Sequence, residues 1–323
     1  MASQSPVPKK VLVFGATGLI GKFILQALVD KKSFEKIGIF TSQETAERKK
    51  ETLDRVRDEG VEVVVGDVNK EADVAKAYGG FDTVVSALGR NVILTQISLL
   101  DIAEASPTIH TFYPSEYGTD IEYAPSSATE KPHQLKLQVR KHIRENIKEL
   151  NVTYLVTGPY SDLYLGKLPG KAGEVGSFDP KEKKAVLLGS GDDRVSFTTM
   201  KDVGKLLVAA LKTEAKESPR ALIVNSFTTT PHEILKEFEK QTDAKWDVSY
   251  TTLTILRKSE KEALDGGDPL ATMYTLRRIW TEGGTLYESR DNGKIGEPKT
   301  ETLEEQVKNA VEKEVAGFQS GIL

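Results

Sequence analysis

The sequence predicts an α/β fold, in which a doubly wound parallel sheet is followed by a smaller C-terminal domain. Three observations support this prediction. In the first half of the chain, short β-branched apolar runs alternate with longer helix-like segments, as they do in βαβ units. A glycine-rich turn separates the first of these runs from the first helix-like segment. After Gly158 the alternation stops, and residues 167–184 are rich in glycine, proline and lysine.

The expected strands are near-continuous apolar runs, which suit a parallel sheet that helices cover on both faces. They comprise residues 11–14, 37–41, 61–65, 83–87, 109–113 and 153–156. The helices expected between them comprise residues 20–29, 46–57, 71–78, 94–105 and 135–150. This alternation predicts right-handed βαβ units and therefore a doubly wound sheet.

The second half of the chain predicts fewer and more widely spaced elements. A loop or short hairpin is expected at residues 167–184, because of its glycine and proline content. A strand followed by a helix is expected within residues 195–211, with Asp202 in the first turn of the helix. A further strand is expected at 221–226, a helix that begins with proline at 231–241, and a last helix at 304–318.

Composition narrows the class of protein. Hydrophobic residues make up 38% of the chain and charged residues 28%, as in ordinary globular proteins. The net charge of −4 gives no reason to expect binding to nucleic acid or to an anionic membrane. No window approaches the ~20 apolar residues that a transmembrane helix requires. The chain contains no cysteine, which fits a reducing compartment such as the cytoplasm. No spacing of histidines and carboxylates resembles a metal site.

The glycine-rich turn has the features of a dinucleotide phosphate loop. Gly15 permits the tight turn, Gly18 lets the backbone approach a pyrophosphate, and Gly21 lets the helix pack closely on the strand. The N-terminus of the following helix offers free N–H groups and the positive end of its dipole to the phosphates. A purely structural turn is the alternative. The predicted contacts to the dinucleotide are made by Gly15, Thr17, Gly18, Leu19, Ile20 and Gly21.

The end of the second strand indicates which dinucleotide binds. NAD-specific sites usually place Asp or Glu there, to hold the ribose 2′-hydroxyl group. This chain has Thr41 and Ser42, followed by the basic residues 48–50, of which we assign Arg48 to the site. Hydroxyl groups and cations suit a 2′-phosphate, so NADPH is expected rather than NADH. The alternative is that the basic residues form the solvated face of a charged helix.

Asp67 and Val68 follow the third strand, where the adenine is expected to lie. The Asp67 carboxylate is suited to accept a hydrogen bond from the adenine amino group, although Gly-Asp is also common in turns. We therefore expect a dinucleotide-binding Rossmann domain over residues 1–157, to which the chain returns at about residues 195–226. Residues 158–323 are expected to form mainly a substrate-binding domain.

Further motifs follow the glycine loop along most of the chain. They are Gly-Asp at 66–67, Ser-Ala-Leu-Gly at 86–89 with Gln96, Phe-Tyr-Pro-Ser-Glu-Tyr-Gly at 112–118 with Asp120, Lys-Leu-Gln-Val-Arg at 136–140, Asp-Val at 202–203, and Asn225 before Thr-Pro-His-Glu-Ile-Leu at 230–235. With these motifs the chain resembles the NmrA-like, isoflavone-reductase-like family, a divergent branch of the short-chain dehydrogenases/reductases. Residues 253–300 match only loosely. The style of the chain favours a fungal member from specialised metabolism.

The resemblance implies a Rossmann domain and a small C-terminal domain, with the substrate held in the cleft between them. Many members of the family reduce conjugated or benzylic positions of phenolic natural products with NADPH, and others sense the dinucleotide without turning it over. The resemblance also implies further cofactor-binding residues, several of which border the nicotinamide. They are Ala87, Leu88, Gly89, Pro114, Ser115, Glu116, Lys136, Gly158, Pro159 and Tyr160.

The chain departs from the family pattern at several positions. Thr41 and Ser42 stand where plant reductases usually have an arginine, and Tyr117 replaces the usual phenylalanine. Lys136 matches the lysine of the Tyr-x-x-x-Lys motif of classical short-chain dehydrogenases, but Pro132 occupies the tyrosine position. No tyrosine acid acts from that position.

By resemblance, Lys136 is the general acid/base beside the nicotinamide. Partial desolvation and the positive charge of an oxidised nicotinamide would both lower the pKa of its amine. The alternative is a surface lysine of an amphipathic helix. Ser115 is the second catalytic candidate and is expected to orient the substrate or the carboxamide. Glu116 is either a cofactor contact or structural. His133, Tyr160 and Tyr164 are substrate candidates, although the histidine can be incidental and the tyrosines can belong to the core.

The leading hypothesis is an NADPH-dependent reductase of a small unsaturated or aromatic metabolite, such as a phenol, an enone or an imine. One alternative is a non-catalytic NAD(P) sensor with a protein partner, against which Lys136 weighs because a sensor needs no proton donor. The other alternative is an isomerase that retains NADPH.

Overall fold

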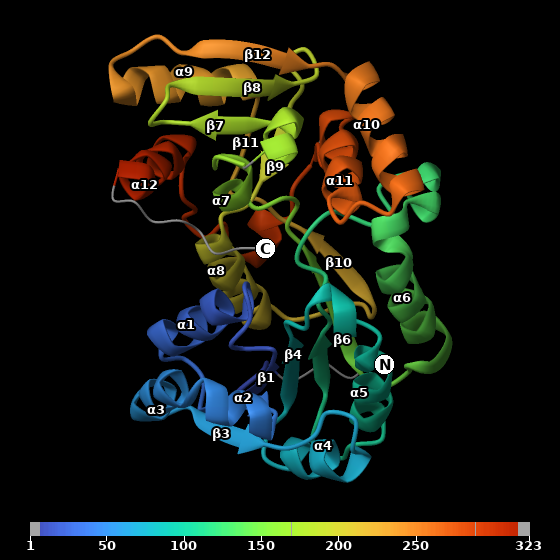
Figure 1. Cartoon of the computed structure of the whole chain (residues 1–323). Helices are drawn as coiled ribbons and strands as arrows, with labels where there is room; N and C mark the ends of the chain where they lie inside the picture. Colours follow the sequence, from blue (N-terminus) through green and yellow to red (C-terminus); the bar gives the residue numbers. More distant parts are fainter. Residues whose placement is uncertain (1–6, 169, 288, 316–323) are drawn as a thin grey trace.

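The computed structural model describes residues 7–168, 170–287 and 289–315. A seven-stranded sheet with the order β10-β6-β5-β4-β1-β2-β3 forms its lower half in Figure 1, and all of its pairings are parallel. The strands are β1 (Lys10–Phe14), β2 (Lys36–Thr41), β3 (Glu62–Val65), β4 (Thr83–Ser86), β5 (Thr111–Tyr113), β6 (Asn151–Val156) and β10 (Arg220–Ile223). The chain leaves β1 toward β2 and β3 and then crosses to β4 on the other side. The predicted doubly wound sheet is therefore confirmed.

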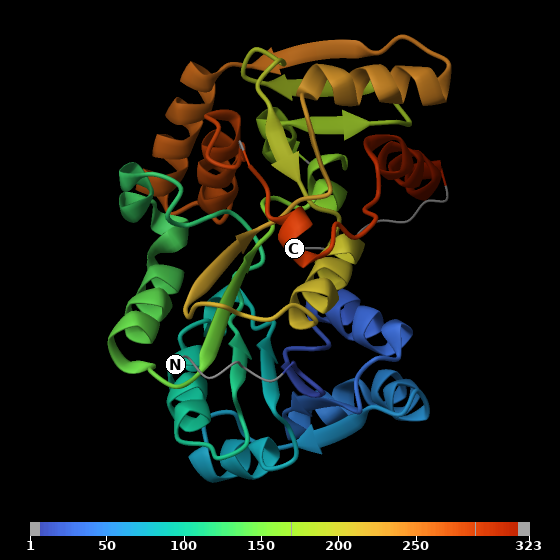
Figure 2. The same ribbon diagram turned by 180° about the vertical axis from the view of Figure 1, so that it is seen from behind.

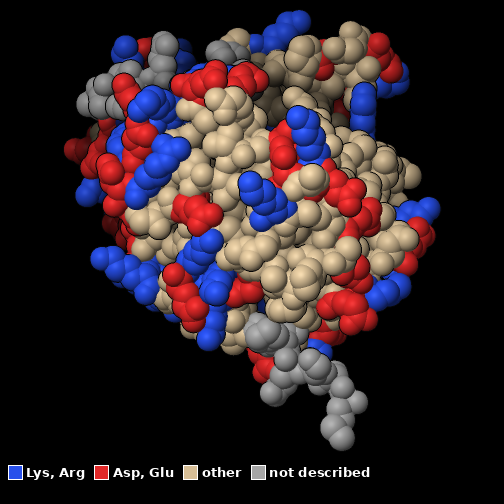
Figure 3. Space-filling view, turned by 90° about the horizontal axis from the view of Figure 1, so that it is seen from below, with Lys and Arg blue, Asp and Glu red and all other residues tan. Residues whose placement is uncertain are grey.

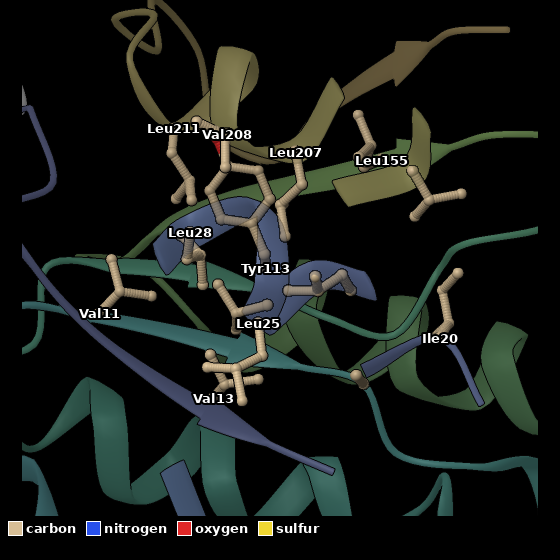
Figure 4. Close-up of a cluster of buried hydrophobic side chains, with 14 of the residues drawn as sticks. Val11, Val13, Ile20, Leu25, Leu28, Tyr113, Leu155, Leu207, Val208 and Leu211 are labelled. Carbon is tan, nitrogen blue, oxygen red and sulfur yellow. The ribbon is translucent and has the colours of Figure 1, made fainter. Parts of the chain in front are cut away.

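Helices cover both faces of this sheet. The bounds of those that follow the strands are α1 (Gly21–Lys31), α2 (Gln43–Arg48), α3 (Lys50–Asp58), α4 (Glu71–Tyr78), α5 (Thr95–Glu104), α6 (Gln134–Asn146) and α8 (Met200–Leu211). Alternate residues of β1 point to opposite faces, as the pleat requires. Val11 and Val13 pack with side chains of α1 and α8 (Figure 4), whereas Leu12 and Phe14 pack with side chains of α4 and α5.

Two predicted helices differ from the observed ones, for local reasons. The helix expected at 46–57 is divided into α2 and α3, because Ser42 caps an earlier start and Lys49 has non-helical dihedral angles (φ −112°, ψ 31°). The helix expected at 135–150 ends at Asn146. The Glu104 carboxylate accepts hydrogen bonds from the backbone N–H groups of residues 148–150, and this draws the chain out of the helix.

The upper half of Figure 1 contains a second, three-stranded sheet. The hairpin expected at 167–184 is formed by β7 (Ser177–Asp179) and β8 (Lys184–Leu188), and β12 (Asp247–Thr251) pairs in parallel with β8. Helix α9 (Pro231–Thr242) leads to β12 and begins with a capping box, in which Thr230 and Glu233 bond each other's backbone N–H groups. This sheet packs around Phe178, Phe238 and Trp246.

The remaining elements connect the two halves. The strand expected near residue 195 is β9 (Val195–Phe197), which pairs with β11 (Phe227–Thr229) and not with the large sheet, whereas β10 does return to that sheet beside β6. Helices α7 (Ser161–Tyr164), α10 (Leu253–Gly266) and α11 (Ala271–Thr281) were not expected from the sequence. Helix α12 comprises Leu303–Val315, and residues 316–318 of the predicted last helix lie outside the described residues. Figure 2 shows the same arrangement from behind.

The surface agrees with the charge balance. On the face seen from below in Figure 3, basic and acidic side chains are interspersed and form no continuous basic area. No helix in the described part of the chain is both long enough and apolar enough to span a membrane.

Candidate active site

The glycine loop lies between β1 and α1. Gly15 has a positive φ of 74°, and a Cβ atom there would lie 2.6 Å from the carbonyl oxygen of Ala87. A Cβ atom at Gly21 would lie 2.1 Å from the carbonyl oxygen of Gly15. At Gly18, that same oxygen, at 3.1 Å, is the only atom of the described residues near a Cβ position, and Gly18 is exposed. Gly15 and Gly21 therefore serve the loop itself, whereas Gly18 leaves an open outer surface.

The N-terminus of α1 has no side-chain cap. Ile20 precedes the helix, and its side chain makes no capping hydrogen bond. Leu19 is exposed and Thr17 is half-buried. The N–H groups of Lys22 and Phe23 donate to the carbonyl oxygens of Gly18 and Ile20, at 3.3 and 3.1 Å. A phosphate group would therefore be held by the N–H groups that precede them and by the partial positive charge of the helix end.

The end of β2 brings a lysine to this loop. The Lys49 amine donates a hydrogen bond to the carbonyl oxygen of Thr17, at 2.7 Å. Thr41 is buried, the Ser42 hydroxyl accepts the backbone N–H of Thr45, and Arg48 is exposed. The cation in contact with the loop is thus Lys49, and not Arg48, which the sequence analysis assigned to the site. The basic run predicted a cation here, but the helix break at residue 49 decides which one points inward.

Asp67 lies at the carboxyl end of β3. Its Oδ1 atom accepts hydrogen bonds from the backbone N–H and the side-chain amide of Asn69, at 2.9 and 3.2 Å. The backbone N–H of Asp67 donates to Asp73. This is turn chemistry, and it leaves Oδ2 without a protein partner in the described structure. Val68 is half-buried beside it.

Ser115 joins the loops that follow β4 and β5. Its hydroxyl donates to the carbonyl oxygen of Leu88 at 2.9 Å, and its N–H donates to Oε1 of Gln96 at 2.7 Å. Because its proton is engaged, the hydroxyl can only accept a hydrogen bond from a ligand. Ala87 and Pro114 are buried in the same two loops, and Gly89 has open space where a side chain would extend.

Glu116 forms a buried ion pair with Arg140 of α6. Two hydrogen bonds of 3.2 and 3.1 Å join them, and only 1% and 2% of their respective side chains are exposed. Arg140 also contacts Glu122 at 2.7 Å and Asp120 at 3.6 Å. The Glu116 carboxylate is therefore committed to holding α6 against the end of β5, which favours its structural interpretation.

Lys136 projects from α6 into the same region. Its side chain is partly buried, and its amine makes no hydrogen bond or ion pair with the residues that the structure describes. The Nζ atom lies 3.9 Å from the position that a Cβ atom would occupy at Gly118. Burial lowers the pKa of the amine, the charge of Glu116 opposes this, and Arg90 and Arg140 lower it further. This combination suits a group that exchanges a proton.

His133 lies one turn before Lys136, and its side chain is buried. Nδ1 lies 3.1 Å from the carbonyl oxygen of Ser127, and Nε2 is buried without a partner in the described structure. Burial lowers the pKa of the ring, and the charge of Lys136 contributes to this. Since a carbonyl oxygen can only accept, Nδ1 carries the proton and Nε2 presents a lone pair.

The two tyrosines assigned to the substrate have different surroundings. Gly158 has a φ of 68°, and Pro159 is buried after it. The Tyr160 hydroxyl donates to the carbonyl oxygen of Tyr117 at 2.8 Å. Tyr164 is buried against Phe197 in the core of the upper half. For both tyrosines the core interpretation accounts for most of the contacts, and one face of Tyr164 lies under Arg277.

Residues that the sequence did not single out complete this region. The Trp280 indole donates to the Thr119 hydroxyl at 2.9 Å, so α11 lies beside the loop that contains Gly118. Tyr287 and Thr285 each bury a hydroxyl group that has no partner among the described residues. The Tyr287 hydroxyl lies 3.4 Å from a Cβ atom placed on Gly158. No motif marks residues 253–300, so no pattern in the sequence points to these groups.

The comparisons with known proteins agree with this geometry. The sequence profile of the NmrA-like family matches residues 8–282. The isoflavone reductase of Pisum sativum is 25% identical over 294 residues, which cover 86% of this chain and 89% of that protein. The oxidoreductase aprR of Aspergillus flavus is 28% identical over 272 residues, which cover 84% and 86%.

Solved structures share the fold. The leucoanthocyanidin reductase of Vitis vinifera in its complex with NADPH superposes with a TM-score of 0.76 at 22% identity, over 94% of this chain and all of that one. A complex described as AtPrR2 with NADP+ and (+)pinoresinol gives a TM-score of 0.77 at 21% identity, over 96% of this chain and all of that one. Since the family profile covers most of the sequence and its fold is present throughout, this chain belongs to the NmrA-like family.

Proposed function

We propose that this protein is an NADPH-dependent reductase of a small unsaturated or aromatic metabolite, such as a phenol, an enone or an imine. One observation carries the proposal. The Lys136 amine is partly buried, has no partner among the described residues, and has a lowered pKa. It lies at the edge of the sheet where the glycine loop also lies. The reductase names of its relatives, from pea isoflavone reductase to the NADPH complex of leucoanthocyanidin reductase, support the same activity.

The residues of the loop fit a dinucleotide. Gly18 is exposed and opens the loop toward a ligand, and α1 has no side-chain cap. These groups would hold the pyrophosphate. Ser42, Arg48 and Lys49 offer a hydroxyl group and two cations at the end of β2, where an NAD-specific site would have a carboxylate. This set favours the 2′-phosphate of NADPH, which supplies the hydride when it is bound.

The chain's own residues would position the substrate and move a proton. Lys136 would protonate a carbonyl oxygen, or deprotonate a phenol, as the hydride is transferred. The Nε2 lone pair of His133 would accept a hydrogen bond from a substrate hydroxyl group. The Ser115 oxygen would accept one from the carboxamide or from the substrate. The Glu116–Arg140 pair keeps α6, and with it the amine, at the edge of the sheet.

The substrate cleft would lie between a domain of residues 1–157 and one of residues 158–323. Two contacts support this division. Trp280 is bonded to Thr119, and the backbone N–H of Gly158 donates to the carbonyl oxygen of Gly118 at 2.8 Å. Both contacts bring the C-terminal half to the loops that surround Lys136.

The test is an assay of the purified protein with NADPH and a panel of enones, imines and phenols, in which the absorbance of the reduced nicotinamide is followed. Oxidation of NADPH that depends on one of these compounds is the expected result. Lys136→Ala should lose this activity. Lys141→Ala is its matched control, because Lys141 lies on the same helix and its side chain is 73% exposed. Tight NADPH binding with no oxidation across the panel would favour a sensor. Conversion of a compound without net oxidation of NADPH would favour an isomerase.

A further inference from the structure

Two arginines of the described structure are almost fully buried, and their electrostatic surroundings are opposite. Arg140, at 2% exposure, contacts the carboxylates of Glu116, Asp120 and Glu122. Arg277 of α11, at 3% exposure, has no ion pair with any described residue. The next residue of α11, Arg278, forms three ion pairs. Arg277 therefore differs from both Arg140 and Arg278, which are each paired with carboxylates.

Arg277 has few polar contacts, and none of them is a carboxylate. One is the hydroxyl group of Tyr164, whose interaction with the guanidinium partly opposes the lowering of the Arg277 pKa by burial. The Nη2 atom of Arg277 donates to the carbonyl oxygen of Leu163 at 3.4 Å, which is a long hydrogen bond. Its Nη1 atom is buried without a partner among the described residues. The guanidinium lies 4.1 Å above the ring of Tyr164 and 5.7 Å from that of Trp280. Cation–π contacts are weaker than the desolvation of a buried charge, so the cation is undercompensated.

Arg277 belongs to the surroundings of the candidate active site. Leu163 and Tyr164 lie in α7, directly after the segment that begins at Gly158. Trp280, one turn along α11 from Arg277, is bonded to Thr119. Thr119 follows Gly118, which Lys136 approaches. The loop of Gly118 and Thr119 therefore lies between the two cations. Lys136 of α6 approaches it from the N-terminal half of the chain, and α11, which carries Arg277, contacts it from the C-terminal half.

We propose that Arg277 binds an anionic group of the substrate, and that the substrate is an aromatic or unsaturated carboxylate. A planar carboxylate matches the two parallel donors of a guanidinium and would supply the charge that the protein omits. The rings of Tyr164 and Trp280 flank the cation and suit an apolar, flat substrate body. That the bound anion is a substrate rests on the proposed reductase function. That Arg277 binds a carboxylate does not depend on it.

The first experiment needs no ligand. Arg277→Met replaces the guanidinium with an apolar side chain of similar length, and the thermal midpoint of the unliganded protein is measured. We expect an unchanged or higher midpoint, because an undercompensated buried charge is removed. Arg140→Met is the matched comparison, and we expect a large fall there, because it leaves the buried Glu116 carboxylate unpaired. A comparable fall for Arg277→Met would show that the cation is structural and would overturn the proposal.

The second experiment measures binding to the NADPH-saturated protein by calorimetry. The probes are benzoate, cinnamate and 3-phenylpropanoate, each compared with its primary amide. We expect at least one acid to bind about ten-fold more tightly than its amide, the difference that one charge-assisted bidentate contact supplies. Arg277→Met should abolish this difference, and Arg257→Gln, a change at an exposed ion pair, should preserve it. Equal affinities for acid and amide, or no binding of any acid, would overturn the proposal.

The two proposals fail differently in these experiments. If carboxylates bind through Arg277 but no unsaturated compound oxidises NADPH, the anion site stands and the reductase function falls. If neutral enones oxidise NADPH equally well in the wild type and in Arg277→Met, and acids show no preference, the reductase function stands and the anion site falls.

Discussion

Lys136 lies one helical turn before Arg140 on α6, so the buried ion pair between Arg140 and Glu116 also fixes the direction of the lysine amine. Residues at i and i+4 share a helix face. The pair holds that face against the loop after β5, and the amine consequently lies beside Gly118. The ion pair that holds α6 in place therefore also positions the amine that is proposed to transfer the proton.

Lys136→Ala is expected to lower turnover by about 10²–10⁴, the usual contribution of a positioned acid/base. NADPH affinity should stay within a few-fold of the wild type, because the glycine loop is untouched. Burial places the pKa of this amine below the usual lysine value. The rate of carbonyl reduction should therefore fall as the pH rises through that lowered pKa, and the variant should lack this titration. Lys136→Arg should not restore the rate, since a guanidinium keeps its proton. Full activity in Lys136→Ala would remove the lysine from the mechanism.

Glu116→Gln is expected to destabilise the protein by about 3–5 kcal/mol, the cost of removing one partner of a buried ion pair. Urea unfolding followed by circular dichroism measures this value. In the fraction that remains folded, kcat should fall more than NADPH affinity, because α6 would no longer hold the amine in place. Glu145→Gln, on the exposed side of the same helix, is the control. Unaltered stability in Glu116→Gln would contradict the role of the pair.

Gly18→Val is expected to abolish NADPH binding in a protein that still folds. Within the described structure, the atom near a Cβ at this position is a loop carbonyl oxygen at 3.1 Å, so the side chain would extend into the space that the pyrophosphate needs. Gly21→Ala should instead impair folding, because its Cβ would lie 2.1 Å from the same oxygen. Thermal unfolding and calorimetric titration separate the two effects. Retained NADPH affinity in folded Gly18→Val would mean that the dinucleotide binds elsewhere.

NADPH is expected to bind at least about ten-fold more tightly than NADH, since a charge-assisted contact contributes roughly 1.5–3 kcal/mol. Lys49→Ala should reduce this preference, because Lys49 is the cation in contact with the loop. Arg55→Ala, an exposed change in α3, should leave it intact. Calorimetric titration with both dinucleotides is the measurement. Equal affinities in the wild type would contradict the assignment of NADPH.

Acid is expected to weaken the attachment of α6. Hydrogen bonds from Arg144, opposed by partial burial and reinforced by Arg140, lower the pKa of Glu122 to about 2 from its usual value of 4.5. A carboxyl group whose pKa is lowered by folding contributes stability above its unfolded pKa and loses it as the pH falls toward the folded one. The wild type should therefore lose more stability than Glu122→Gln between about pH 4.5 and pH 2. Parallel urea titrations at these pH values would test this, and identical losses would contradict it.

The large sheet could be predicted because its strands are short apolar runs that no exposed element would tolerate. Val84 and Val85 of β4, for example, are fully buried on opposite faces. Helix boundaries were less predictable where a distant side chain decides them, as Glu104 does at the end of α6. Periodicity along one segment contains no information about a carboxylate that is more than forty residues away.

The candidate site could be predicted where backbone chemistry requires a residue type. At Gly15 and Gly21 a side chain would clash with the backbone of the loop, so a sequence motif can identify these positions. Which cation reaches the loop could not be predicted, because Lys49 points inward only through a break between two helices. Arg277 and Trp280 lie on a helix with no motif, and their relation to the site arises from packing alone.

The hydrogen bond between Trp280 and Thr119 makes the protein its own optical reporter. The chain contains two tryptophans, and Trp246 lies in the core of the upper half, packed against Phe238. In Trp246→Phe, the remaining indole emission would arise from the rim of the candidate site alone. A compound that enters between α11 and the loop after β5 would shift or quench this emission, whereas one that binds only at the adenosine end would not. Occupancy of the two ends can then be followed separately, without a label and without turnover.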